Sequence, residues 1–458
     1  MTKPAWTLAV ASTAGYLLVL DLVGVNIALP NMQERLNASL AEVQWTVDAY
    51  AFTLASLLLA AGALADRYGR RRLFLLGLGV FTAASLGCAL APSAPVLDVV
   101  RALQGFGGAL LFGTTAALLA AAYPAGRERN RALGIFSAAS GGAIATAPLV
   151  GGGLTELFDW RAIFFLNVPI GLIGFVIALR MLEESYDPRP RPLDLLGTGL
   201  LTGGLAALMW ALIDGPHAGW GSPQVLAALA VAALAFTGLA LHRVAEPMID
   251  LSLLRNKLYA ANALGGFTFN IVGAGSTAYF SLYVQGPMHA RPAEAGLWFL
   301  AFSIPALAAP LALSRSVHRF PPAALVAIGP LLCAVSAVLS ALTYGLHSWP
   351  ALLPAFIIGG TGIGVGNLVS GQIGLASAPA ERAGLASALT QTAKQLGIAV
   401  GIAVLGIPYG ESGLGAMLAT AATIGFLGAL PALWLWRSTH RPAASTPAEV
   451  ARRRPAAR

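Results

Sequence analysis

The sequence predicts an all-α integral membrane protein with fourteen transmembrane helices. Hydrophobic residues make up 57% of the 458 residues and charged residues only 10%, whereas soluble domains carry roughly 25% charged residues. The mean hydropathy of the chain is +0.73. Apolar runs long enough to cross a bilayer, which takes about 20 residues, recur along the whole chain. The composition therefore predicts many spans rather than a single anchor.

Each predicted span is an apolar run that ends at charged or turn-forming residues. Arg127-Glu128-Arg129 and Glu381-Arg382 divide two of the longest runs, and the glycine-rich turn at 215–221 joins the seventh and eighth spans. The predicted limits are 6–30, 45–65, 73–91, 95–122, 131–155, 161–182, 194–214, 223–242, 258–285, 293–314, 322–344, 350–376, 383–407 and 414–436.

Several kinds of segment and site are not expected. The first apolar run has no small-residue cleavage pattern, so we expect no cleavable signal. The cysteines, Cys88 and Cys333, lie far apart in apolar runs, which argues against a disulfide or metal site. Neither a phosphate-binding loop nor a nucleophile elbow occurs. We therefore expect no enzyme activity and no cofactor.

The basic residues predict the orientation of the chain in the membrane. With the N-terminus inside, most of the 28 Lys and Arg residues fall in loops on the inner side, as the positive-inside rule requires. An even number of spans returns the C-terminus to the same side. We expect a multi-pass protein of the cytoplasmic membrane with both termini in the cytoplasm, and this topology accounts for the net charge of +8 without nucleic acid.

Three charged residues on three predicted spans of the first bundle stand out: Asp21 in the first span, Asp48 in the second and Arg101 in the fourth. A charge at bilayer depth costs at least about 2.5–3.5 kcal/mol and indicates a functional site. Burial favours the neutral form of a carboxyl group, so these carboxylates are candidates for proton coupling, with Arg101 as their partner. The alternatives are a static buried ion pair and, for Asp48, a helix-start carboxylate that faces water.

The loop at 62–72 is the most specific motif, with glycines for a tight turn, one aspartate and four arginines. Asp66 can cap the following helix or pair with an arginine. Taken alone, the loop is also compatible with an ordinary positive-inside turn. The residues singled out as gating residues here are Gly62, Asp66, Arg67, Gly69 and Arg70.

Together with three other segments, this loop resembles the Major Facilitator Superfamily, specifically its fourteen-span drug:proton antiporter group. The segment from Leu20-Asp21 to Pro30 is similar to the first-span signature. Segment 101–109 is similar to the fourth-span motif, and segment 159–171 to the entry of the sixth span. The resemblance covers nearly the whole chain, but its specific motifs lie in the first half.

The fifth span carries the element that, in this superfamily, separates exporters from importers. The family has glycine where this chain has Ala143 and Ala147. Gly141, Ala145, Pro148 and Gly152 form a small-residue stripe that allows another helix to approach closely, with a bend at the proline. The resemblance implies a gating role for Pro148, Gly151 and Gly152; the alternative is tight packing alone.

The second half offers polar rather than acidic candidates. The ninth span carries polar residues that either line a cavity or bond to other helices. Lys394 matches a basic position common in the resembling group, and it either pairs with a carboxylate or snorkels to the surface. The predicted substrate-binding residues are Asp21, Asp48, Gln104, Asn270, Tyr279, Tyr283 and Lys394.

The resemblance implies a six-helix bundle at 1–185, an inserted helix pair at 186–245, a second six-helix bundle at 246–437 and a disordered tail at 438–458. It also implies proton-driven export of small amphipathic or cationic compounds by alternating access, by a chain that acts as a monomer. Two alternatives stay open. One is an exporter or symporter of a single metabolite, and the other is a receptor or lipid-handling scaffold that transports nothing.

Overall fold

The computed structural model describes residues 2–124, 126–186, 194–242, 251–314, 316–377 and 383–439. Within these ranges the secondary structure is helical. The α-helices are α1 Lys3–Leu36, α2 Leu40–Tyr68, α3 Arg70–Ala89, α4 Ala94–Ala122, α5 Arg127–Leu157, α6 Arg161–Met181, α7 Leu195–Ala218, α8 Pro223–Leu241, α9 Lys257–Val272, α10 Ser276–Gln285, α11 Pro292–Leu313, α12 Pro322–Thr343, α13 Trp349–Ala376, α14 Ala383–Ser412 and α15 Leu414–Thr439. Most of the predicted tail, residues 440–458, lies outside the described ranges.

The predicted all-α membrane fold is confirmed, with one correction in the ninth span. Among the described residues, thirteen helices are long and apolar enough to cross a membrane. The run at 258–285 is two short helices, α9 and α10, rather than one. The break falls at Gly273-Ala274-Gly275, where the N–H groups of Ala274 and Gly275 both donate to the carbonyl of Asn270. Glycine is a poor helix former, and Gly275 lies against the backbone of Gly401 in α14.

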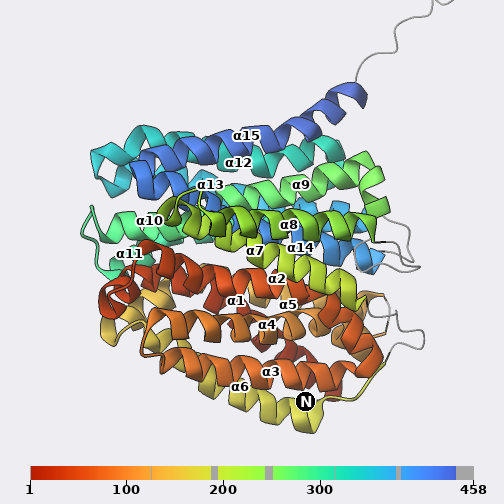
Figure 1. Cartoon of the computed structure of the whole chain (residues 1–458). Helices are drawn as coiled ribbons and strands as arrows, with labels where there is room; N and C mark the ends of the chain where they lie inside the picture. The colour runs from red at the N-terminus through yellow and green to blue at the C-terminus, as the bar shows by residue number, and fades with distance from the viewer. Residues whose placement is uncertain are drawn as a thin grey trace, which may run out of the picture.

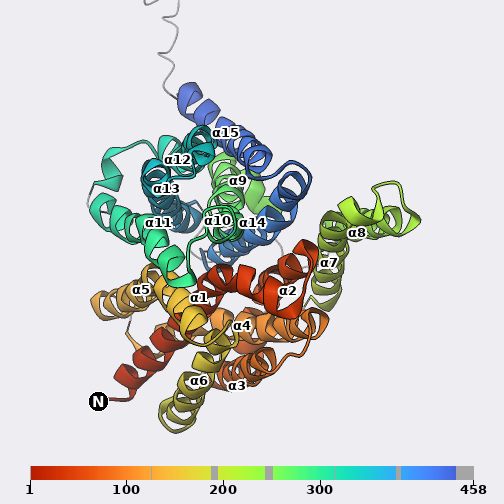
Figure 2. The same ribbon diagram turned by 90° about the vertical axis from the view of Figure 1, so that its left-hand side faces the viewer.

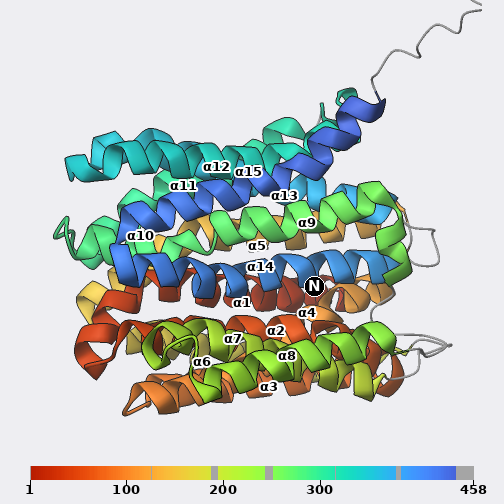
Figure 3. The ribbon, with the colours of Figure 1, turned by 45° about the horizontal axis from the view of Figure 1, so that its top comes forward.

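The helices gather into two groups and a pair, seen along their axes in Figure 2. Helices α1–α6 pack together, α9–α15 form the second group, and α7 packs with α8 beside α2 and α14. The axes of the long helices are roughly aligned with one another (Figure 3). We call α1–α6 the first half and α9–α15 the second half.

The start of α1 and the end of α15 lie at the same end of the molecule (Figure 1). We call this the near end, and the opposite end, where α10 is followed by α11, the far end. Helix α2 begins at the far end with a capping box, in which Ser39 and Glu42 each accept a hydrogen bond from the other's backbone N–H. This motif satisfies N–H groups that a helix start leaves free.

Candidate functional site

Asp21 and Arg101 form a buried ion pair between α1 and α4. Arg101 Nη1 lies 2.5 Å from Asp21 Oδ2, and both side chains are 0% exposed. One turn further along α1, Gly24 lies against the backbone of Ala147 in α5, where only a small residue leaves room for the two helices to pack closely. The structure therefore brings together the two oppositely charged residues that the sequence marks at similar depth.

Two amides complete the hydrogen bonding of Asp21. Its Oδ1 accepts from Gln104 Nε2 at 3.1 Å and from Asn167 Nδ2 of α6 at 2.9 Å. Gln104 also accepts from Arg101 and donates to Ser85 of α3. Charge-assisted bonds of this kind are stronger than neutral ones, so the network holds the Asp21 carboxylate in place against Arg101.

Helix α2 holds the other side of the Arg101 guanidinium. Arg101 Nε donates a hydrogen bond to the Thr46 carbonyl at 2.9 Å, and Arg101 Cζ lies 4.3 Å from the centroid of the Tyr50 ring. The Thr46 hydroxyl in turn donates to Asp98 Oδ1 of α4 at 2.8 Å. Arg101 thus ties α1, α2 and α4 together, and a change in its charge balance acts on three helices at once.

Asp48 lies deep in α2, and within the described part of the chain its carboxylate accepts no hydrogen bond. Because α2 begins at Leu40, Asp48 is about 12 Å along the helix axis, at 1.5 Å per residue, and it is 0% exposed. The alternative of a helix-start carboxylate that faces water is therefore wrong. Both of its carboxylate oxygens are without a hydrogen bond among the described residues. An isolated buried charge is very costly, so this group is suited to binding a proton or a cation.

Polar contacts between the two halves join their far-end parts. Asn26 donates to Thr277 at 3.2 Å, Gln285 donates to the Ile27 carbonyl at 2.8 Å, and Gln44 donates to the Tyr279 hydroxyl at 3.0 Å. Between the described residues of α1–α6 and α9–α14, all cross-half hydrogen bonds lie in this region.

At the far end itself, Glu156 links α5 to α11. Its carboxylate accepts from Arg291 at 3.2 Å and from the Ala293 N–H at 2.9 Å. Hydrogen bonding to Glu294, followed by the charges of Glu294 and Glu156, raises the pKa of Arg291. This exposed contact adds to the buried ones, and together they hold the halves in a far-end-closed arrangement.

The gating stripe of α5 meets α11 directly below that contact. A Cβ at Gly152 would collide with the Pro292 carbonyl, and one at Gly296 would collide with the Pro148 carbonyl. Gly151 faces the other way, against Gly24 of α1. Pro148, Gly151 and Gly152 therefore occupy a close three-helix contact that spans both halves, which fits the small-residue packing expected from the sequence.

The loop between α2 and α3 is tied to the first half. Asp66 pairs with Arg70 at 2.8 Å, one of the two predicted alternatives. Gly69 adopts a φ of 112°, which favours glycine, while Arg67 is exposed. Glu184, just after α6, accepts hydrogen bonds from the N–H groups of Arg71 and Arg72. Gly62 lies farther up α2, close to Gly113 of α4.

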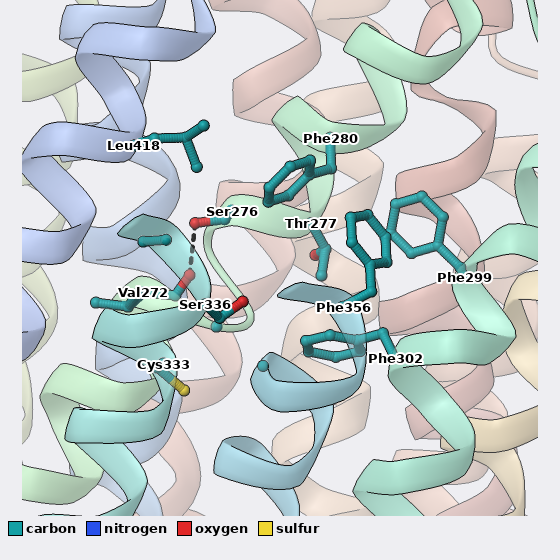
Figure 4. Close-up of a pocket in the computed structure, with 13 residues that line it drawn as sticks. Val272, Ser276, Thr277, Phe280, Phe299, Phe302, Cys333, Ser336, Phe356 and Leu418 are labelled. Atoms are coloured by element: carbon teal, nitrogen blue, oxygen red, sulfur yellow. Dashed lines mark hydrogen bonds between the residues drawn. The ribbon is translucent and has the colours of Figure 1, made fainter. Parts of the chain in front are cut away.

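The polar candidates of α9 and α10 divide between the two predicted roles. Ser276 and Thr277 line a cavity of about 20 Å³ at the break between these helices, with Phe280, Phe299 and Phe356 across from them (Figure 4). A space of this size holds about one water. Asn270 instead bonds to its own helix.

Tyr279, Tyr283 and Lys394 make structural hydrogen bonds. Tyr279 donates to the Ile402 carbonyl of α14, and Tyr283 donates to the Tyr344 carbonyl. Lys394 neither pairs with a described carboxylate nor reaches for the surface, so both predicted alternatives are wrong. Its Nζ donates to Asn367 of α13 at 3.0 Å, within the second half, and no carboxylate among the described residues forms an ion pair with it.

Asn167 and Glu184 are site residues that the sequence interpretation missed. Asn167 stands in segment 159–171, and a polar amide within an otherwise apolar run was a usable signal. Glu184 follows a span end with no recognisable pattern. Among the described residues no group of three His, Cys, Asp or Glu side chains could hold a metal ion.

This arrangement defines a class: a multi-span helical membrane protein with a buried charge network and two halves in contact at one end. The sequence matches the model of the Major Facilitator Superfamily over residues 11–282 and 258–457. The chain belongs to this superfamily. It is a membrane transport protein, and the prediction that it is not an enzyme is confirmed.

Relatives are similar over most of the chain. The methylenomycin A resistance protein of Streptomyces coelicolor is 36% identical, covering 96% of this chain and 93% of the relative. The multidrug efflux pump LfrA of Mycolicibacterium smegmatis is 34% identical, covering 88% and 80%. A crystal structure of a POT family transporter in complex with 5-aminolevulinic acid has a TM-score of 0.72 at 15% identity and covers 95% of this chain and 96% of that one. That likeness shows the fold alone.

Proposed function

We propose that this protein exports small amphipathic or cationic compounds by alternating access, driven by protons. It does so as a monomer in the cytoplasmic membrane, with both termini in the cytoplasm. The observation that carries the proposal is the buried ion pair of Asp21 and Arg101, because a transporter coupled to protons needs a protonatable group out of contact with bulk water.

Coupling follows from the partners of that pair. When Asp21 binds a proton, Arg101 loses its counter-charge at 2.5 Å, and its bond to the Thr46 carbonyl lets α2 respond. Asp48, on the same helix, has no competing hydrogen bond among the described residues. It is free to receive a proton or the positive group of a substrate, and neutralising it releases that substrate.

Alternating access needs contacts at one end that can open while the other end closes. The Glu156–Arg291 pair and the buried contacts of Asn26, Gln44 and Gln285 supply them at the far end. With the positive-inside orientation, the far end faces outward, and the present arrangement is closed to the outside.

The substrate class is supported by the names of the relatives. One relative is named a multidrug efflux pump, and another is named a tetracenomycin C resistance and export protein.

Proteoliposomes with an imposed pH gradient test the proposal with a panel of cationic dyes, neutral antibiotics and common metabolites. We expect gradient-driven movement of several unrelated cationic amphiphiles, with proton movement in the opposite direction. Transport of one metabolite alone would favour a specific exporter or symporter. No substrate-dependent proton flux with any compound would favour a receptor or scaffold.

A further inference from the structure

A side crevice lies between α2, α7 and α14, away from the ion pair. It has a volume of about 290 Å³, near the lower limit of about 300 Å³ for small-molecule sites. Helix α7 belongs to the pair that separates the two halves in sequence, and here it forms one wall. The lining residues are Leu40, Gln44, Leu212, Ile213, Pro216, Ala403, Gly406, Ile407, Gly410 and Glu411.

The inner wall of the crevice is a hydrogen-bonded pair rather than packed apolar side chains. Gln44 is buried and donates to the Tyr279 hydroxyl at 3.0 Å. Gly406 leaves the space that both side chains occupy, because a Cβ there would collide with Gln44 and lie 2.6 Å from the Tyr279 hydroxyl. One helical turn beyond Gln44 on α2 lies the buried Asp48. The Gln44–Tyr279 pair therefore stands on the helix that carries Asp48, one turn closer to the far end.

The mouth of the crevice carries negative charge. Glu411, in the last turn of α14, is the charged residue among those that line it. Asp214 follows the lining residue Ile213 on α7 and accepts a hydrogen bond from Trp45 Nε1 at 3.3 Å. Apolar walls with a carboxylate at the rim complement an elongated molecule that has one apolar arm and one positive head.

We propose that this crevice is a second ligand site, which binds the apolar arm of an amphipathic monocation while Glu411 meets its charge. Breaking the Gln44–Tyr279 hydrogen bond then connects this side site with Asp48. Helix α7 lines the site and is needed to form it. The inference rests on the proposed export of amphipathic cations, and it assigns a role to the inserted helix pair.

Binding can be measured without transport. Both native cysteines are buried, so an Ile407→Cys variant with Cys88 and Cys333 replaced by alanine gives one reactive thiol inside the crevice. In lipid nanodiscs without a gradient, dodecyltrimethylammonium should slow maleimide labelling of Ile407→Cys. Dodecanol, a neutral compound of equal chain length, should need at least a tenfold higher concentration to slow the labelling to the same extent. Phospholipid that protects as well as the cation would instead mean a lipid-filled groove and would overturn the proposal.

Two further variants separate the site from general effects on the helices. Gly410→Phe fills the crevice, and its Cβ makes only ordinary contact, at 3.6 Å from Leu40; it should raise the protecting concentration at least tenfold. Gly203→Phe on α7, with open space around it, should not. Glu411→Gln should remove the difference between the cation and the neutral compound. Unchanged protection in Gly410→Phe rejects the site even if the protein transports cations, whereas protection without any transport would reject the proposed function alone.

Discussion

The carboxylate of Asp21 and the guanidinium of Arg101 meet at 2.5 Å with neither side chain exposed. Removing one partner of such a pair leaves an uncompensated buried charge, which typically costs about 3–5 kcal/mol. A transporter can use that energy if a proton, rather than a mutation, removes the charge. The pair ties α1 to α4, and it is the place where we propose that the proton acts.

Asp21→Asn should abolish gradient-driven efflux while substrate exchange without a gradient continues. The amide keeps the size of the side chain and an oxygen that can accept from Asn167, so the fold is retained, but it cannot gain or lose a proton. The measurement is efflux from proteoliposomes with and without a pH gradient, with Asp159→Asn, a partly exposed carboxylate, as the control. Normal gradient-driven transport by Asp21→Asn would remove this residue from coupling.

Arg101→Gln and Asp21→Asn should be strongly coupled in stability. Each single change leaves one charge unpaired in the interior, whereas the double change leaves none, so the double variant should be less destabilised than the sum of the singles by at least about 1 kcal/mol. Unfolding in detergent at neutral pH measures the three values. Additive losses would show that the pair contributes little as a pair.

The sequence was sufficient to single out Asp21, Asp48 and Arg101 because few charges interrupt the spans of the first half, but it did not tell which carboxylate pairs with Arg101. It was insufficient for the Lys394–Asn367 bond, since hydropathy does not tell which helix faces which. It also did not predict the break between α9 and α10. Gly273 and Gly275 stand there, but the chain has 52 glycines, and glycine is common in membrane helices.

The start of α2 explains why the water-facing alternative for Asp48 is wrong. The apolar run suggests a start near 45, but the Ser39–Glu42 capping box begins α2 at Leu40, which carries Asp48 further into the interior. A capping box is readable in a sequence, so Ser39 and Glu42 carry the signal that places Asp48 more than two turns inside α2. The contacts of Glu184 with α3 depend on the tertiary fold and had no such signal.

Asp48→Asn should weaken transport of dicationic compounds more than that of monocationic or neutral ones. A unit charge about 4 Å away is worth roughly 4 kcal/mol at an effective dielectric near 20, before desolvation is subtracted, and a dication can engage both Asp21 and Asp48. Because no described residue hydrogen-bonds to the buried Asp48 carboxylate, its replacement should not lower the unfolding temperature. A series of mono- and dications of equal apolar area provides the test, and equal losses across the series would make Asp48 structural or part of the proton path.

Asp66→Ala should slow turnover with little loss of substrate affinity. The change removes the Asp66–Arg70 pair but leaves the Glu184 contacts that hold the start of α3, so the loop loosens without unfolding. Binding and single-turnover efflux separate the two effects. Glu183→Gln is a suitable control, since its pair with Lys3 is largely exposed. A large loss of affinity with normal turnover would place the loop in substrate binding instead.

Gly152→Ala and Gly296→Ala should each shift the protein away from the far-end-closed arrangement. The added methyl groups would meet the carbonyls of Pro292 and Pro148, respectively, and rigid backbone cannot yield as a side-chain tip can. Overpacking of this kind typically costs about 1–3 kcal/mol, which corresponds to a population shift of roughly fivefold or more. This destabilisation acts only on states in which α5 and α11 touch.

Gly153→Ala is the matched control, because a Cβ added at Gly153, next to Gly152 in the chain, would point into open space. Spin labels on the far ends of α5 and α11 should report a longer distance in Gly152→Ala and Gly296→Ala but not in Gly153→Ala, together with slower transport. Unchanged distances in all three variants would show that this contact does not move during the transport cycle.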